Sequence, residues 1–230
     1  MAIVGKGFMI VWHDIREEME PEYHRWHTRE HMPERLGVPG FLRGRRGVDW
    51  SRDQYRYLTL YEGKDLDVFG SAAYLERLNN PTPWTNKVQP AFYNFIRSGC
   101  SIISTTGRGV GGALITIRLS FDGSNEAKLE ADAAALTEQI IKLDGVSSVD
   151  FGASRPEVTG AKTRETELRG LNRDGLFDAV LIVDGIGRRE LEEALPAIAK
   201  ILQESGWNFG DDDKAVYDMA YMLEPLGPSS

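Results

Sequence analysis

Strand-like and helix-like hydrophobic patterns alternate along the first half of the chain. Residues 6–15 form a largely apolar, β-branched and aromatic run, which predicts a strand. Residues 18–36 predict a helix, because Pro21 suits a first turn and a glycine- and proline-rich stretch follows residue 36. Further patterns predict a hairpin, a second helix and a last strand, at residues 41–49, 54–62, 65–78 and 88–104. The predicted order is therefore β-α-β-β-α-β.

The same order of elements repeats after a glycine-rich turn at residues 107–112. Apolar runs predict four more strands, at residues 113–121, 145–153, 176–185 and 215–223. Two longer stretches rich in alanine and leucine predict helices, at residues 125–143 and 188–204. Residues 155–175 are polar and predict a loop that is longer than most. The halves show little residue identity, so the repeat is one of element order.

This repeat predicts the fold class. A β-α-β-β-α-β order is that of the ferredoxin-like split βαβ unit. Two such units in tandem can pack their sheets together, which hides the apolar faces that one unit would leave exposed. We therefore predict an α+β fold with two tandem ferredoxin-like βαββαβ units, over residues 1–106 and 107–230. The sequence does not decide whether the units pair within one chain or between two, so a homodimer is also open.

The composition of the chain argues against several classes of partner and site. The net charge of -8 argues against nucleic acid, because binding to phosphates needs a basic face. No apolar run approaches the roughly 20 residues of a membrane span. The single cysteine, Cys100, excludes a disulfide framework and a cysteine-based zinc site. We expect a cytoplasmic protein with a small-molecule substrate and with neither nucleic-acid nor membrane partners.

The histidines give the strongest chemical signal. All four lie in the first half, and three of them, His24, His27 and His31, lie on its first predicted helix. Because residues four apart share a helical face, His27 and His31 stack while His24 is rotated away from them. Tyr23 and Trp26 lie beside this stripe. Since histidine titrates near neutral pH, the cluster predicts a general acid–base site rather than only a charged helix surface.

The same segment resembles a known family. Residues 23–31 read Tyr-x-x-Trp-x-x-x-x-His and residues 39–41 read Pro-Gly-Phe. This pattern resembles the signature of EthD-like proteins in the dimeric α/β-barrel superfamily, whose members include cofactor-free isomerases, polyketide cyclases, monooxygenases and haem enzymes. The resemblance implies an α/β-barrel with a small-molecule pocket between helices and sheet, and His31 as its acid or base. The first helix of the second half has no histidine or tryptophan, so no site is expected there.

A second motif overlaps the first. Residues 27–31 read His-Thr-Arg-Glu-His, which matches the inverted zinc-peptidase motif H-x-x-E-H. Two imidazoles and the carboxylate of Glu30 would suit a metal-bound water and its general base. The motif also resembles that of the pitrilysin-type peptidases, which need a further glutamate ligand on a later helix. Residues 98–110 hold no Asp, Glu or His, so we predict no metal site.

Strand alternation adds further candidates. Phe41, Arg43 and Arg45 are expected on one face of their strand, and Tyr55, Tyr57, Thr59 and Tyr61 on one face of the next. Tyrosine hydroxyls and a guanidinium near an imidazole can hold a carboxylate or phenolate, although both residue types are also common as packing and ion-pair residues. The predicted catalytic residues are His31, His27 and His13. The predicted substrate-binding residues are Tyr23, Trp26, Arg43, Tyr57 and Trp84.

These observations leave three functions from different classes. The first is a cofactor-free enzyme acting on a small aromatic or enolisable acid or ketone, by a lyase, isomerase or cyclase step through an enolate. The second is a haem-binding protein with a histidine as axial ligand. The third is a non-catalytic binding module, for which the space between the first helix and the sheet would be fully packed. The sequence favours the first, because the histidine and aromatic cluster occurs in a chain with no cofactor motif.

Overall fold

The apolar run at the start of the chain forms β1 (Gly7–Ile15), whose nine residues are all buried. In a computed structural model that describes residues 3–121, 126–170, 173–174 and 176–226, β1 pairs antiparallel on both edges. Its neighbours are β3 (Tyr57–Gly63) and β4 (Phe92–Gly107), and β3 pairs in turn with β2 (Phe41–Val48). The first unit therefore has the strand order β4-β1-β3-β2, which is that of a ferredoxin-like sheet.

The second unit repeats this arrangement. Its first strand, β5 (Ala113–Leu119), pairs with β8 (Ala179–Gly185) and with β9 (Lys214–Leu223). The remaining strand, β6 (Val146–Ser154), pairs with β8. The order β9-β5-β8-β6 is thus the counterpart of the order in the first unit. The predicted α+β class with two ferredoxin-like units is confirmed.

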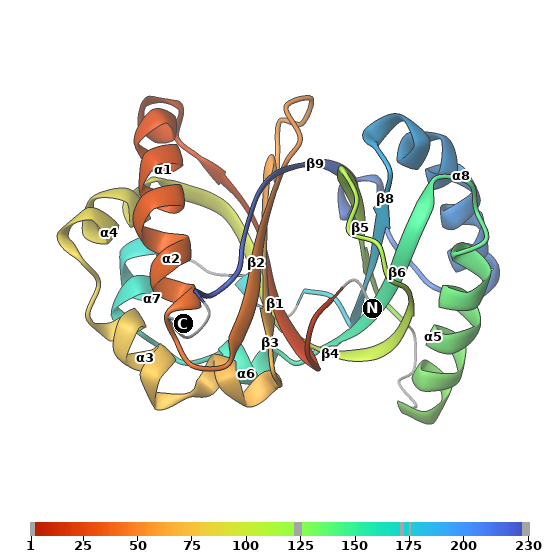
Figure 1. The fold of residues 1–230 in the computed structure, drawn as a ribbon, viewed down its shortest axis with the longest axis horizontal. Helices are drawn as coiled ribbons and strands as arrows, with labels where there is room; N and C mark the ends of the chain where they lie inside the picture. Colours follow the sequence, from red (N-terminus) through yellow and green to blue (C-terminus); the bar gives the residue numbers. More distant parts are fainter. Residues whose placement is uncertain (1–2, 122–125, 171–172, 175, 227–230) are drawn as a thin grey trace.

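Two further antiparallel pairings, β2 with β9 and β4 with β6, join the edges of the two sheets. Together with the β1–β4 pairing they close eight strands into one barrel (Figure 1). The predicted α/β-barrel is therefore confirmed, and both of its halves come from a single chain. The proposed unit boundary at residues 106 and 107 coincides with the end of β4 and stays a prediction.

Helices cover the barrel on two opposite sides (Figure 1). On the side of the first unit lie α1 (Glu20–Trp26), α2 (Met32–Leu36), α3 (Ala72–Asn79), α4 (Pro83–Val88), α6 (Pro156–Thr159) and α7 (Arg164–Arg169). On the other side lie α5 (Glu126–Ile140) and α8 (Arg188–Glu204). None of the helices in the described part of the chain is both long enough and apolar enough to span a bilayer.

The barrel interior is apolar with a buried ionic cluster. Inward-facing side chains include Phe8, Trp12, Leu60 and Ile182, which belong to one hydrophobic cluster. The ionic cluster consists of Arg43, Arg45, Glu62 and Asp184. Within it, Arg43 Nη2 lies 2.7 Å from Glu62 Oε2, and Arg45 Nη1 lies 2.8 Å from Asp184 Oδ1. Because these charges are paired at short distances, none of these four groups is an isolated buried ion.

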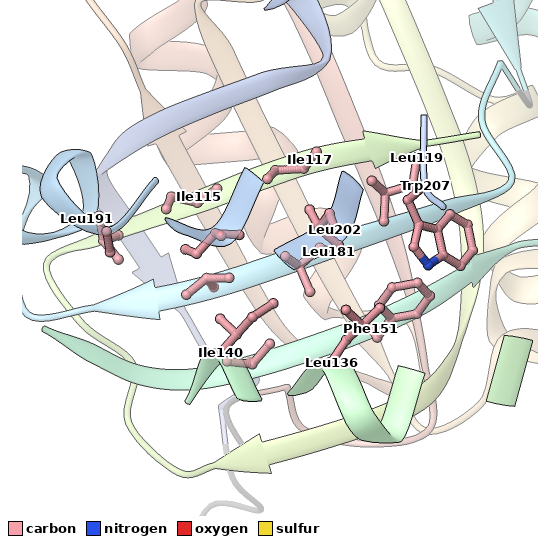
Figure 2. Packing of buried hydrophobic residues seen from close by; sticks show 14 of the residues in the cluster. Ile115, Ile117, Leu119, Leu136, Ile140, Phe151, Leu181, Leu191, Leu202 and Trp207 are labelled. Carbon is pink, nitrogen blue, oxygen red and sulfur yellow. The ribbon is translucent and has the colours of Figure 1, made fainter. Parts of the chain in front are cut away.

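The space between the sheet of the second unit and its helices is filled by apolar side chains. Leu136 and Ile140 of α5 and Leu191 and Leu202 of α8 pack on outward-facing residues of β5, β6 and β8, and Trp207 closes one end (Figure 2). These labelled residues are at most 2% exposed. This helix layer is therefore a hydrophobic core.

One prediction about local structure is wrong. The polar stretch 155–175 is not one long loop, because it contains α6, α7 and the short strand β7 (Arg173–Asp174), which pairs parallel with β4. The segment around Trp84, for which no element was predicted, is helical and forms α4. Thr82 caps this helix by accepting a hydrogen bond from the backbone N–H of Thr85 at 3.0 Å, and Pro83 occupies its first turn.

Candidate active site

A cavity lies between the outer face of the first unit's sheet and the helices that cover it. Its volume is about 40 Å³. Strands β1, β3 and β4 form its floor, and the helical segment 20–36, α3 and α7 form its walls. The side chains that line it are Met9, Val11, His13, His27, His31, Arg35, Thr59, Tyr61, Tyr74, Leu78, Gln89, Phe92, Phe95, Arg97, Glu165 and Arg169.

The helix with the histidines has an unusual turn at the site. Residues His27–His31 form a π-helical turn between α1 and α2, and such turns often occur at functional sites. The side chains of His27 and His31 both line the cavity, with ring centroids 5.4 Å apart. The Trp26 ring lies against His31 with a centroid distance of 4.2 Å, and its Nε1 donates to Thr85 Oγ1 at 3.1 Å. Trp26 thus fixes the orientation of His31 from behind without lining the cavity.

His13 reaches the same cavity from the end of β1. The β1–β4 register shifts between Trp12 and Asp14, so a bulge lies at this histidine. His13 Nε2 lies 2.8 Å from Tyr23 Oη, and the ring of Tyr57 stacks on His13 at 5.6 Å. Tyr57 donates its hydroxyl hydrogen to Glu20. The two predicted tyrosines therefore hold His13 in place and stand behind the cavity wall.

All three cavity histidines are neutral at neutral pH. Burial lowers the pKa of His13, His27 and His31 well below 6.5, and the positive charges of arginines such as Arg46 and Arg35 lower these pKa values further. The Nδ1 atom of each ring is buried and has no hydrogen-bond partner among the described residues. A neutral imidazole with an unused nitrogen can accept or donate a proton to a ligand.

One end of the cavity carries charged residues that the sequence analysis missed. Arg35 is ion-paired with Glu165, and Gln89 Nε2 donates to the other oxygen of this carboxylate at 3.2 Å. Arg169 Nη1 donates to Gln89 Oε1 at 3.0 Å, and burial lowers the pKa of Arg169 to about 10. Glu165 and Arg169 belong to α7, in the stretch predicted to be a loop. The position of Arg35 beside the histidines could have been predicted from the sequence, because it lies four residues after His31 on the same predicted helix.

None of the five predicted substrate-binding residues lines the cavity: Tyr23, Trp26 and Tyr57 stand behind its wall, and the other two lie elsewhere. The β2–β3 register shifts between Phe41 and Arg43, so Phe41 packs with the helices while Arg43 points into the barrel and pairs with Glu62. Simple alternation had placed both side chains on one face. Trp84 is also outside the cavity, because its Nε1 donates to Glu22 Oε1 at 3.0 Å and ties α4 to α1.

The histidine–glutamate motif does not form a metal centre in this geometry. Glu30 accepts a hydrogen bond from Thr82 Oγ1 at 2.5 Å, so its carboxylate faces α4 and not the imidazoles. His24 is likewise turned away from the cavity, as its spacing predicts, and its Nδ1 lies 2.7 Å from Arg46 Nη2. In the described part of the chain, no group of three or more His, Cys, Asp or Glu residues is arranged to hold a metal ion.

Solved structures of other proteins share the whole architecture. A candidate monooxygenase from Fusobacterium nucleatum subsp. nucleatum has a TM-score of 0.58 and 12% identity over 98% of each chain. An anthrone oxidase-like protein has a TM-score of 0.58 and 7% identity over 95% of this chain and 92% of its own. The chlorite dismutase of Candidatus Nitrospira defluvii has a TM-score of 0.57 and 8% identity over 94% of this chain and 92% of its own.

The fold is that of the dimeric α/β-barrel proteins. At these identities the likeness establishes the ferredoxin-like barrel and no activity. No protein-family model matches the chain, and no curated protein matches its sequence. Within this α/β-barrel, the two helix layers differ in content: the layer of the second unit is packed with apolar side chains, whereas that of the first unit encloses a polar cavity. The residues that line this cavity are therefore the candidate functional residues of the chain.

Proposed function

We propose that the chain is a cofactor-free enzyme that acts on a small aromatic or enolisable acid or ketone by histidine general acid–base catalysis. The observation that supports this most directly is the combination of three neutral imidazoles and buried guanidinium groups around one cavity. A neutral imidazole is the form that removes a proton from carbon. A fixed positive charge nearby stabilises the enolate that this step leaves behind.

His31 is the proposed base. Of the three cavity histidines it alone keeps partial exposure, whereas His13 and His27 are 1% and 2% exposed. His13 is engaged by Tyr23, and His27 Nε2 lies 3.4 Å from Thr59 Oγ1. His31 would take a proton from the carbon beside the substrate carbonyl. Returning that proton at another atom gives an isomerase, and loss of a leaving group from the enolate gives a lyase.

The EthD-like signature is consistent with this assignment. Of its residues, Trp26 packs on the ring of His31, and Tyr23 contacts His13. Both aromatic residues that precede His31 in the signature thus position a cavity histidine. We propose on this ground that the chain is related to the EthD-like proteins and that His31 has the acid–base role that the resemblance implies.

The two other functions have less support from the geometry. A haem is far larger than this cavity of about 40 Å³, so the residues around it do not fit the macrocycle in this arrangement. The non-catalytic binding module predicts a fully packed space between the first helix and the sheet. That space instead contains a cavity lined by imidazole nitrogens that have no partner among the described residues, in contrast to the apolar packing of the second unit (Figure 2).

A thermal-shift screen tests the proposal. Wild type, His31→Ala and the control His24→Ala are heated with small aromatic acids, keto acids and ketones. A ligand at a hundred times its Kd stabilises the native state by about 2.7 kcal/mol, which raises the Tm of a chain this long by roughly 5–10 °C. We expect a shift in wild type and in the His24 variant that is lost in His31→Ala. No shift with any compound, or equal shifts in all three proteins, would refute the proposed role.

A further inference from the structure

Arg35 offers a charged donor to the cavity. Its side chain is 1% exposed, and Glu165 binds its Nη2 atom. Its Nη1 atom forms an ion pair with Glu34 Oε2 at 3.4 Å but has no hydrogen-bond partner among the described residues. A guanidinium has five N–H donors in a planar fork that matches a carboxylate. One side of this fork is therefore hydrogen-bonded to the protein, and the other side has donors that a ligand can use.

Tyr61 offers a neutral donor to the same cavity. The residue is 2% exposed, and its buried hydroxyl has no hydrogen-bond partner within the described ranges. Burial raises the pKa of Tyr61 well above 10 even though Arg35 is close enough to lower it. The phenol thus keeps its hydrogen and can donate it. A buried polar group without a partner is costly in an empty site, and this cost is removed when a ligand accepts the hydrogen bond.

The charge of the lining also favours an anion. Three arginines and one glutamate line the cavity: Arg35, Arg97, Arg169 and Glu165. Both oxygens of Glu165 are already engaged, one by Arg35 and the other by Gln89, so this carboxylate does not saturate the positive end. The neutral histidines add no negative charge. An anionic group entering the cavity is therefore attracted to the end where Arg35 lies.

We propose that Arg35 and Tyr61 form an anion subsite that binds the carboxylate of a small organic acid beside His31. This inference rests on the proposed function and sharpens it: the substrate is an enolisable or aromatic acid rather than a neutral ketone. The rings of Tyr61 and His31 are in edge-to-face contact with centroids 6.4 Å apart, so the donor and the base line adjoining parts of the cavity. Glu165 is then a positioning residue, through which the second unit completes the site of the first.

The test uses acids and their uncharged amides of nearly the same shape. Pyruvate, pyruvamide, acetate and acetamide, which are small enough for this cavity, are titrated against wild type by ligand-detected NMR, which gives a Kd for each. The same titrations are run on Tyr61→Phe, and on Tyr93→Phe as a matched control, because Tyr93 is 45% exposed and does not line the cavity. Tyr61→Phe removes only a hydroxyl that bonds to no described residue, so this variant is expected to fold. Arg35→Lys, checked for folding by circular dichroism, tests the charged donor.

We expect wild type and Tyr93→Phe to bind each acid about tenfold or more tightly than its amide, because one hydrogen bond to a charged group has about that value. Tyr61→Phe and Arg35→Lys should each reduce this preference about tenfold without weakening amide binding. Equal binding of acids and amides, or an acid preference unchanged in Tyr61→Phe, would overturn the subsite. Absence of binding by all four probes would overturn it as well. Ketones that bind wild type but not His31→Ala would then still support the proposed function.

Discussion

The buried histidines should make the stability of the protein fall steeply below pH 6.5. In the unfolded chain each imidazole binds a proton with a pKa of about 6.5, whereas in the folded state burial lowers the pKa of His13, His27 and His31 well below that value. The unfolded state therefore binds more protons as the pH falls. Their contribution to stability is complete above pH 6.5 and is lost progressively as the pH drops towards the folded-state pKa values.

The size of the effect follows from proton linkage. For each histidine that stays neutral in the folded state, the free energy of unfolding falls by about 1.4 kcal/mol as the pH drops from 7.5 to 5.5. Three such histidines together lower it by about 4 kcal/mol. Asp150 opposes this loss, because burial raises its pKa to about 6. Its protonation in the folded state adds about 1 kcal/mol over the same range. The pH dependence of the wild-type unfolding free energy is thus the sum of these opposing effects. A single-site variant is needed to measure the contribution of one histidine.

His27→Gln is the informative variant, because His27 is 2% exposed and packs against Thr59. Urea unfolding of wild type, His27→Gln and the half-exposed control His24→Gln is followed by tryptophan fluorescence at pH 7.5, 6.5 and 5.5. The substitution shifts the stability at every pH, but the loss between pH 7.5 and 5.5 should shrink by about 1.4 kcal/mol in His27→Gln and by less in the control. A loss in His27→Gln equal to that of wild type would show that His27 is protonated in the folded state and would refute the neutral-imidazole site.

Three further predictions follow from single contacts. Glu165→Ala leaves Arg35 buried without its main partner and should lower the unfolding free energy by about 3–5 kcal/mol, measured by urea denaturation at pH 7.5; a loss below about 1 kcal/mol would show that the pair is not buried. Asp150→Asn should stabilise the protein by about 3 kcal/mol at pH 8, where the carboxylate with a raised pKa must be charged, and by only about 1 kcal/mol at pH 4.5; the same gain at both values would contradict this cause. Deleting the exposed Arg29 should convert the π-helical turn into an α-turn and rotate His31, so that ligand binding is lost while the far-UV circular dichroism is kept.

The sequence predicted the barrel because its signal is local and repeated. Each strand is a run of apolar or β-branched residues, and the order of elements identifies the unit without any knowledge of contacts. The histidine cluster was likewise predictable, since His27 and His31 are close in sequence and their helix has clear ends. Local spacing alone places both imidazoles on one face, and the structure has both lining one cavity.

The remainder of the site depends on long-range packing and on irregular backbone. Glu165 and Arg169 are more than a hundred residues from the histidines, and nothing in their polar surroundings indicates that α7 covers the first unit. Arg43 was misplaced because a bulge in β2 shifts the side-chain alternation by one residue. A bulge has no reliable sequence signal, so the sequence placed Arg43 on the face that carries the helices. The cavity is instead lined by Arg35, which lies on the same helical segment as His31.

Removal of a proton from carbon by His31 is the central claim, and hydrogen–deuterium exchange tests it without knowledge of the natural reaction. Pyruvate and 2-oxobutyrate, two small enolisable keto acids, are incubated in D₂O with wild type, His31→Gln and His24→Gln, and the loss of the signal from the protons beside the carbonyl is followed by ¹H NMR. We predict that wild type and His24→Gln accelerate exchange and that His31→Gln reduces the acceleration about a hundredfold or more. Acceleration in wild type that is unchanged in His31→Gln, or none in wild type with an acid shown to bind, would contradict the account.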